Sequence, residues 1–175
     1  MIRRLSYYAE EAARTPFEQF AAAHQHHVLV VLPPNDTSSE SFHTTDFGSK
    51  VMETRPPIDG RYRVAPLTRR IDGHPLSVFL TVGRAGTNDI VLKDIEVSKT
   101  HAIFEEDSQG NWTVRDNDST NGTFLNAQRV ALGGKRLVRS SDTIRFGGLS
   151  AVFFNQSDFY QFLRSREVVD GLLDE

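Results

Sequence analysis

Short runs of alternating apolar and polar residues fill the middle of the chain. Val78, Leu80 and Val82 stand at every second position, which places their side chains on one face of an extended segment. The same period returns in four further pairs: Ile90 and Leu92, Ala102 and Phe104, Trp112 and Val114, and Ile144 and Phe146. Turn-forming dipeptides such as Asn121-Gly122 and Gly133-Gly134 separate these runs. Many short strands with frequent turns predict an antiparallel sandwich or barrel.

Both ends of the chain predict helices. Near the N-terminus, apolar residues follow at helical spacing from Thr15-Pro16-Phe17-Glu18, which has the form of a capping box with proline at the first helical position. The same spacing recurs after Asn155, and either Asn155 or Ser157 can cap the start of that helix. Between these ends, Val28–Leu32 is a short apolar run typical of a strand. Asn35–Lys50 is polar without a regular period, which favours a flexible linker.

These patterns divide the chain into four parts. We expect a helix-containing extension at residues 1–34 and a flexible linker at 35–66. The β-rich domain is expected at 67–154, and an amphipathic helix at 155–175. The expected fold class is therefore mainly β, with helical extensions at both ends.

Composition narrows the classes of function. The 175 residues are 38% hydrophobic and 25% charged, as in a soluble globular protein, and include no cysteine for a disulfide or a thiolate metal site. Glu10 and Glu11 interrupt the start before any signal-peptide core, and no apolar run approaches the ~18 residues of a membrane span. The net charge is −3, and the β-rich part is nearly neutral. We therefore expect a cytoplasmic protein that binds neither nucleic acid nor membrane.

Three polar segments lie at the ends of expected strands: Gly83-Arg84, Ser98–His101 and Ser119–Asn126. Loops held by a rigid sheet are the usual place for binding residues. The side chains in these segments suit a phosphate dianion, because guanidinium, ammonium and hydroxyl groups all donate hydrogen bonds to it. Asn121 offers a donor and an acceptor, as a grip on a peptide backbone requires.

The same segments resemble the forkhead-associated (FHA) domain in order and spacing. The matching runs are Val82-Gly-Arg, Asn88-Asp-Ile-Val-Leu, Val97-Ser-Lys-Thr-His-Ala, Trp112-Thr-Val-Arg-Asp, Ser119-Thr-Asn-Gly-Thr-Phe-Leu-Asn and Asp142-Thr-Ile-Arg-Phe-Gly. The resemblance extends over Leu67–Phe154, about half of the chain. It implies an eleven-stranded antiparallel β-sandwich (SMAD/FHA-like) that binds phosphothreonine peptides through loops at one end.

The resemblance also implies roles for particular residues. Arg84 and Ser98 match the main phosphate ligands, and Lys99 matches a further ligand at a variable position. Thr120 is expected to help hold the phosphothreonine. Asn121 is expected to bond the main chain of the peptide.

Four more positions follow from the same resemblance. Gly83, His101 and Gly122 match structural positions, with His101 bracing the binding loops. Glu96 stands two residues before the motif serine, a position linked to the choice of a residue C-terminal to the phosphothreonine. A basic or neutral residue is then favoured there over an acidic one. A small apolar recess for the γ-methyl group of threonine is worth only about 1–3 kcal/mol.

The expected function is an adaptor or signalling module that binds phosphothreonine peptides in a Ser/Thr kinase pathway. It needs no cofactor and no metal, and it is expected not to be an enzyme. One alternative is an FHA fold used as a phosphate-independent interaction scaffold. Another is a hydrolase that uses His101 with a nearby serine, although no Gly-x-Ser-x-Gly elbow, Gly-Lys-Ser/Thr phosphate loop or paired-histidine metal motif is present.

Three features of the sequence allow both a structural and a functional interpretation. His24, His26 and His27 form either a polar helix end or a metal cluster. The last helix packs on its own domain or on a partner. Thr44-Thr45-Asp46 is simple linker, or it is a phosphorylation site whose product occupies the chain's own binding site.

Overall fold

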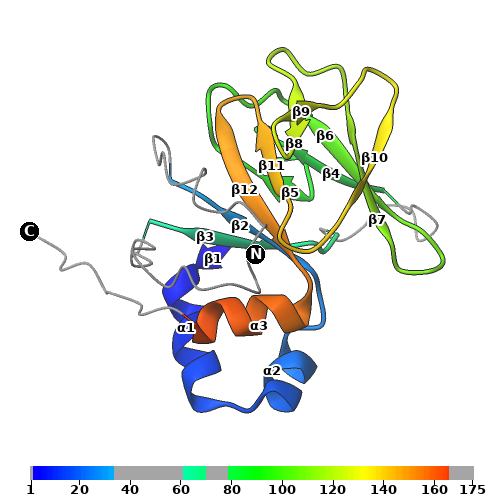
Figure 1. Ribbon diagram of the computed structural model, residues 1–175. Coiled ribbons are helices and arrows are strands. Elements are labelled where there is room, and N and C mark those ends of the chain that lie inside the picture. The colour runs from blue at the N-terminus through cyan, green and yellow to red at the C-terminus, as the bar shows by residue number, and fades with distance from the viewer. Residues whose placement is uncertain (1, 34–60, 70–78, 166–175) are drawn as a thin grey trace, which may run out of the picture.

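The computed structural model describes residues 2–33, 61–69 and 79–165 (Figure 1). Two packed β-sheets form its centre, and three helices gather beneath one end of them. The larger sheet has seven strands, in the spatial order β1 (Arg3–Arg4), β3 (Arg63–Pro66), β2 (Val28–Val31), β12 (Leu149–Phe154), β11 (Thr143–Phe146), β8 (Thr123–Leu125) and β9 (Gln128–Arg129). The smaller sheet has five, in the order β10 (Lys135–Val138), β7 (Trp112–Asp116), β6 (Ala102–Glu106), β4 (Phe79–Gly83) and β5 (Ile90–Val91).

The expected β-sandwich is confirmed, with two differences. The described residues contain twelve strands instead of eleven. One pair is parallel instead of antiparallel, because Val82 and Gly83 of β4 lie beside Ile90 and Val91 of β5 in the same direction. The loop 84–89 makes this possible by folding back completely, and the buried Asn88 holds it in that shape.

The core between the sheets confirms the alternation in the sequence. The inward residues are those at the period-two positions: Leu80, Val82, Ala102, Phe104, Trp112, Val114, Ile144 and Phe146. Each is at most 8% exposed, so every expected strand that the structure describes turns its apolar face inward. Val78 and residues 35–60 of the expected linker lie outside the described residues, whereas residues 63–66 of that range form β3.

A second core explains why the run at residues 28–32 is apolar without alternation. Leu29 and Val31 face the space between the sheets, whereas Val28 and Val30 face the helices. A strand covered on both sides needs apolar residues at every position. Strands β2 and β3 lie outside residues 67–154, so the seven-stranded sheet extends beyond the part of the chain that the sequence pattern assigned to the sandwich.

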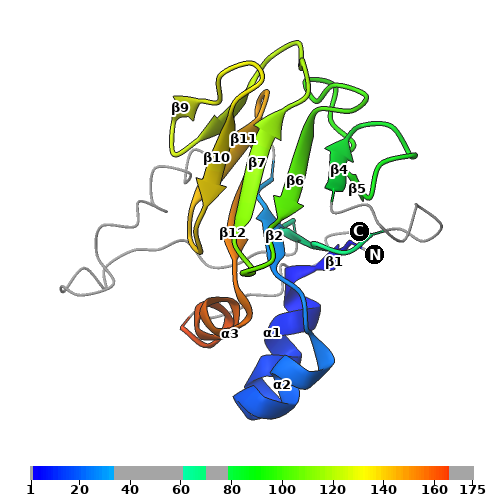
Figure 2. The ribbon, with the colours of Figure 1, turned by 90° about the vertical axis from the view of Figure 1, so that its right-hand side faces the viewer.

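The helices are α1 (Leu5–Arg14), α2 (Phe17–Ala23) and α3 (Gln156–Arg164). Helix α3 packs against α1, α2 and β12, with Phe159, Phe162 and Leu163 buried among them. The last helix therefore packs on its own chain (Figure 2). Asn155 caps α3, as expected, since its Oδ1 accepts a hydrogen bond of 2.8 Å from the backbone N–H of Asp158.

The expected capping box before α2 is wrong. Pro16 is the N-cap residue, and no side chain caps the helix. The Thr15 side chain instead donates to the carbonyl oxygen of Glu11, so it closes α1.

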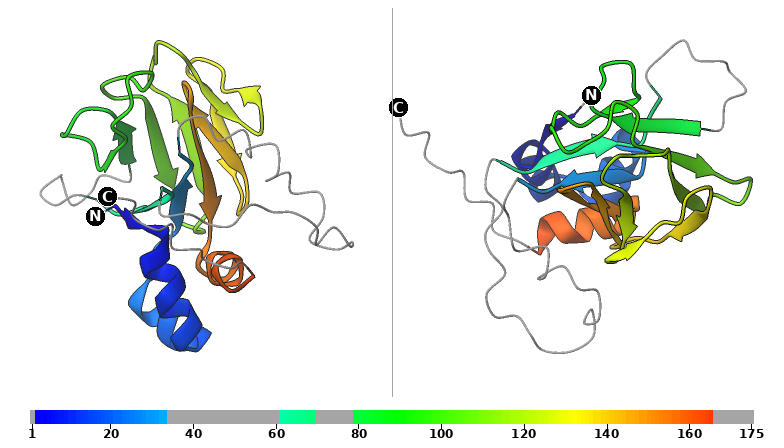
Figure 3. Two further views of the ribbon diagram at one scale, coloured as in Figure 1. Left: turned by 90° about the vertical axis from the view of Figure 1, so that its left-hand side faces the viewer. Right: turned by 90° about the horizontal axis from the view of Figure 1, so that it is seen from above.

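The two ends of the sandwich differ in what they carry. The hairpin between β6 and β7 lies at the end near the helices (Figure 2). The loops that precede β6 and follow β7 lie at the opposite end, together with the loop after β4 (Figure 3). Gly83-Arg84, Ser98–His101 and residues 119–122 are therefore grouped away from the helices, whereas Asn126 lies beyond the other end of β8, bonded to Asp142 and Thr143.

Candidate functional site

Three loops meet at the end of the sandwich away from the helices: residues 84–89, 92–101 and 117–122. The backbone N–H groups of Arg84 and Ala85 donate to the carbonyl oxygens of Ser98 and Lys99 at 2.9 and 3.0 Å. These bonds join the first loop to the second. The second loop is joined to the third through Ser98, which contacts Thr120, and through His101, which contacts Gly122.

Ser98 and Thr120 form the closest contact between the two later loops. The backbone N–H of Thr120 donates to Ser98 Oγ at 3.0 Å, and the two hydroxyl oxygens are 3.4 Å apart. Both residues stand at the rim, where Thr120 is exposed and Ser98 half-buried. Two hydroxyl groups this close can donate to the same anion.

The two expected cations lie on the same rim. Arg84 is exposed, and its Nε donates to the carbonyl oxygen of Val97 at 3.2 Å, so its guanidinium lies over the residue before Ser98. Lys99 is also exposed. Its carbonyl oxygen accepts a bond of 2.6 Å from the Asn88 amide. The backbone of Lys99 is thus held in place, while its long side chain extends from the surface.

His101 braces the loops from inside. It is fully buried. Nδ1 accepts the backbone N–H of Ser98 at 3.0 Å, which assigns the ring proton to Nε2, 3.1 Å from the carbonyl oxygen of Gly122. Burial lowers the pKa of His101, although the bond to Gly122 and the nearby Asp116 oppose the shift. A neutral ring suits this role, because an imidazolium would place a second N–H against that of Ser98.

Asn121 and Glu96 lie beside each other at the edge of the site. Asn121 Nδ2 donates to the carbonyl oxygen of Glu96 at 3.0 Å. This bond takes one N–H of the Asn121 amide, which has a second N–H and a carbonyl oxygen. The Glu96 side chain is exposed and lies over Gly148, where an added Cβ would collide with the carboxylate.

Two glycines are required, Gly83 by a close approach and Gly122 by its backbone conformation. A Cβ on Gly83 would collide with the carbonyl oxygen of Lys99 and lie 2.8 Å from Thr100 Cα, so only glycine lets the first two loops touch. Gly122 has φ +82°, and a Cβ there would lie 2.9 Å from Arg129 Nε. All nine residues singled out from the sequence therefore belong to these three loops or adjoin them directly.

Sequence reasoning missed two residues that shape the site. Asn88 is 2% exposed and donates to the carbonyl oxygens of Ala85 and Lys99 at 2.8 and 2.6 Å. Its place in a turn between two strands gave no sign of a role in fixing the neighbouring loop.

The second missed residue is Asp116 at the end of β7. Its Oδ1 accepts from the hydroxyls of Ser119 and Thr123 at 2.5 and 2.6 Å, and its Oδ2 accepts from the Ser119 N–H at 2.9 Å. Burial works to raise the pKa of Asp116, but these hydrogen bonds outweigh it and hold the pKa below its ordinary value. An Asp followed three residues later by Ser is a turn signal that could have pointed to it.

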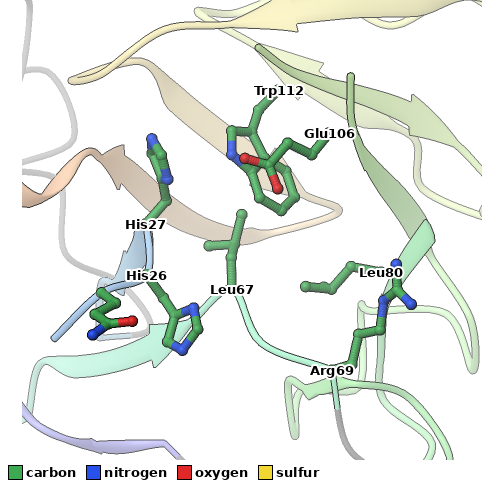
Figure 4. A pocket seen from close by; sticks show the side chains of 8 residues that line it. His26, His27, Leu67, Arg69, Leu80, Glu106 and Trp112 are labelled. Carbon is green, nitrogen blue, oxygen red and sulfur yellow. The ribbon is translucent and has the colours of Figure 1, made fainter. Parts of the chain in front are cut away.

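A separate cavity of about 220 Å³ lies at the other end of the sandwich (Figure 4). The residues lining it are Gln25, His26, His27, Leu67, Arg69, Leu80, Glu106 and Trp112. His27 packs on Trp112 and Phe153 with ring centroids 5.8 and 5.3 Å away, and burial lowers its pKa. This cavity marks where the N-terminal segment meets the sandwich, and none of the expected site residues lines it.

The histidine cluster does not form a metal site in the described part of the chain. His24 pairs with Glu11 at 2.9 Å, whereas His27 stacks on Phe153. Residues 2–33, 61–69 and 79–165 contain no group of three or more His, Cys, Asp or Glu placed to hold a metal ion. None of the helices in these ranges is long and apolar enough to cross a membrane.

Comparison with known proteins identifies the domain. Residues 80–147 match the family model of the FHA domain, so this part of the chain is an FHA domain. The E3 ubiquitin-protein ligase DMA2 of Saccharomyces cerevisiae is 42% identical over 62 residues, which are 33% of this chain and 12% of that protein. The ABC transporter ATP-binding/permease protein Rv1747 of Mycobacterium tuberculosis is 38% identical over 84 residues, 48% of this chain and 9% of that protein. The chain thus spans about a tenth of the length of these relatives.

Solved FHA domains are similar as well. The N-terminal FHA domain of Rad53p from Saccharomyces cerevisiae, solved with a phosphothreonine peptide, is 27% identical with a TM-score of 0.45 over 57% of this chain and 89% of that one. The FHA domain of CT664 from Chlamydia trachomatis is 16% identical with a TM-score of 0.49 over 74% of this chain and 97% of that one.

Proposed function

We propose that this chain binds phosphothreonine-containing proteins and acts as an adaptor in a Ser/Thr kinase pathway. The observation that carries the proposal is the contact between Ser98 and Thr120, which places two hydroxyls within 3.4 Å on a rim that also bears Arg84. A phosphate at this rim would receive hydrogen bonds from hydroxyl and guanidinium groups together. Lys99 would add a point charge, and Asn121 would bond the peptide main chain.

The shape of the site favours binding without chemistry. Both ring nitrogens of His101 are engaged, one by the Ser98 N–H and the other at Gly122. The ring is also fully buried, so it cannot exchange a proton with a bound ligand. We therefore propose that the chain captures a phosphate that a kinase has already transferred, in the cytoplasm where such kinases act.

Glu96 is the proposed specificity residue. Its backbone carbonyl accepts a hydrogen bond from Asn121, the residue proposed to hold the peptide backbone, and its exposed carboxylate lies over Gly148. A negative charge there disfavours an acidic ligand residue on that side by like-charge repulsion. A basic or neutral residue C-terminal to the phosphothreonine is therefore the expected ligand feature.

Removing the Arg84 guanidinium tests the proposal. Arg84→Ala removes a charged hydrogen bond worth about 1.5–3 kcal/mol, so affinity should fall roughly 10–100-fold. The assay is calorimetric titration with a peptide selected from an oriented phosphothreonine library. Arg139→Ala is the matched control, since Arg139 is an exposed arginine of the sandwich at the end near α3.

Two results would contradict the proposal. Equal phosphopeptide affinity of folded Arg84→Ala and wild type would refute the assignment of Arg84 to the phosphate site. Equal affinity of wild type for the phosphorylated peptide and its unphosphorylated counterpart would favour a phosphate-independent scaffold instead.

A further inference from the structure

Two arginines and a phenylalanine form a row across the outer face of the seven-stranded sheet. The strand register places Phe124 of β8 beside Arg145 of β11 on one side and beside Arg129 of β9 on the other. Leu125, the next residue of β8, points into the core, so Phe124 points outward. We call Arg129, Phe124 and Arg145 the arginine row.

Contacts within the domain position the Arg145 guanidinium. The Arg145 guanidinium carbon lies 3.7 Å from the centroid of the Phe124 ring, and its Nη1 donates to the carbonyl oxygen of Gly147. The Arg145 side chain, held by these two contacts, loses less conformational freedom on binding a ligand. Arg129 is exposed, and its guanidinium lies close to Gly122.

The arginine row adjoins the proposed phosphothreonine site directly. Gly122 follows Asn121, and the carbonyl oxygen of Gly122 accepts the N–H of Gly147 at 3.0 Å. Gly122 and Gly147, the residues that Arg129 and Arg145 approach, are therefore joined by a backbone hydrogen bond. Glu96 contacts Asn121 and Arg129 approaches Gly122, so charges of opposite sign border the loop 117–122.

Nearby carboxylates are engaged with other groups. Asp142 accepts from the Asn126 amide at 2.7 Å and from the Arg139 N–H at 2.7 Å. Asp116 accepts from Ser119 and Thr123. Both carboxylates keep their negative charge, and the Glu96 carboxylate lies over Gly148, next to the Gly147 carbonyl that Arg145 contacts. Arg129, which lies against Gly122, is the exposed guanidinium next to Asn121.

We propose that the arginine row is a second subsite, which binds the carboxylate of an Asp or Glu in the same phosphothreonine peptide. The inference rests on the proposed function and adds a second requirement to its ligand. A planar guanidinium matches a carboxylate with two parallel hydrogen bonds, so Arg129 fits a monoanion without further donors. An extended peptide advances about 3.3 Å per residue, so the acidic residue stands within a few positions of the phosphothreonine.

An aspartate scan tests this directly. One phosphothreonine peptide with neutral flanks is made with aspartate, and separately with asparagine, at each flanking position in turn. Wild type should bind one or two of the aspartate peptides about two- to fivefold more tightly than the asparagine partners, as for an exposed ion pair. Arg129→Gln should abolish that gain without changing affinity for the neutral peptide. Arg145→Gln should reduce the gain, and the control Arg139→Gln should retain it.

Each result separates the two proposals. Phosphate-dependent binding with no aspartate preference would overturn the second subsite alone, as would the same preference in wild type and Arg129→Gln. Loss of the gain in Arg139→Gln as well would also overturn it, because net charge alone would then account for the preference. Equal binding of phosphorylated and unphosphorylated peptides would refute the proposed function itself.

Discussion

Asp116 holds the loop that carries Thr120 and Asn121, although we expect it to touch no ligand. Asp116→Asn keeps the size of the side chain and replaces one carboxylate oxygen by an NH2 group. Three accepted hydrogen bonds, from two hydroxyls and one backbone N–H, then compete for a single amide oxygen. If Nδ2 faces the Ser119 N–H, two donors oppose each other.

The magnitude follows from these bonds. A hydrogen bond to a charged group is worth about 1.5–3 kcal/mol, so losing one of the three should lower the free energy of unfolding by about 2 kcal/mol. The loosened turn no longer holds the Thr120 N–H on Ser98 Oγ, which is the contact that places the two hydroxyls together. We expect phosphopeptide affinity to fall about tenfold, the equivalent of about 1.4 kcal/mol.

Asp107→Asn is the matched control. Asp107 braces the β6–β7 hairpin in the same manner, accepting the N–H groups of Gln109 and Asn111 at 2.8 Å each, but it lies at the opposite end of the sandwich. Urea denaturation and calorimetric titration of both variants separate stability from binding. Asp107→Asn should bind as wild type does. Equal affinities of the two variants would refute the idea that Asp116 organises the site.

The stability effect of Asp116→Asn should also depend on pH. The pKa of Asp116 is lower in the folded chain than in the unfolded one, so the stabilisation is present above the unfolded value of about 3.8. It is lost as the pH falls through the lower folded value, because the carboxyl then protonates in both states. The difference between wild type and Asp116→Asn should therefore shrink in strong acid, as measured by denaturation at several pH values.

Three further predictions concern the frame of the domain. Stability should fall as the pH drops below about 6.5, because burial lowers the pKa of His101 and His27 and the unfolded chain then binds protons first; a constant urea midpoint from about pH 7.5 to 5 would contradict this. Gly83→Ala should lower stability by about 1–3 kcal/mol in thermal denaturation, since its Cβ collides with the Lys99 carbonyl; unchanged stability would mean that the loops can separate at no cost. Phe159→Ala should cost about 3–5 kcal/mol yet leave phosphopeptide affinity of the folded chain unaltered, because Phe159 packs beneath the other end; a matching loss of affinity would show that the two ends are coupled.

The sequence was most informative where a contact is local. Alternation predicted which side chains enter the core, as Phe104 and Phe146 show. The motif residues could be assigned to one site because their order and spacing resemble the FHA domain. Their position at strand ends alone does not decide this, since the β6–β7 hairpin lies at the opposite end of the sandwich. Asn155 was recognisable as a cap because its bond reaches only three residues ahead.

Contacts between distant segments were not predictable in the same way. Val28–Val31 could be read as a strand, but nothing in those residues specifies that they pair with β12, more than a hundred positions later. Asn88 and Asp116 have ordinary turn sequences, and their importance comes from the carbonyls and hydroxyls that tertiary folding brings to them. Thr15 and Glu18 suggested a capping box for α2, but the Thr15 side chain donates to the carbonyl oxygen of Glu11 in α1 instead.

The position of β2 inside the larger sheet determines how this protein can be shortened for experiments. A recombinant fragment limited to residues 80–147 would lack β2, β3 and β12. Strand β11 would then present an open, apolar edge to neighbouring molecules, an arrangement that promotes intermolecular pairing. Fragments for peptide titrations should therefore begin before Val28 and continue past Phe154, so that the sheet retains its inner strands.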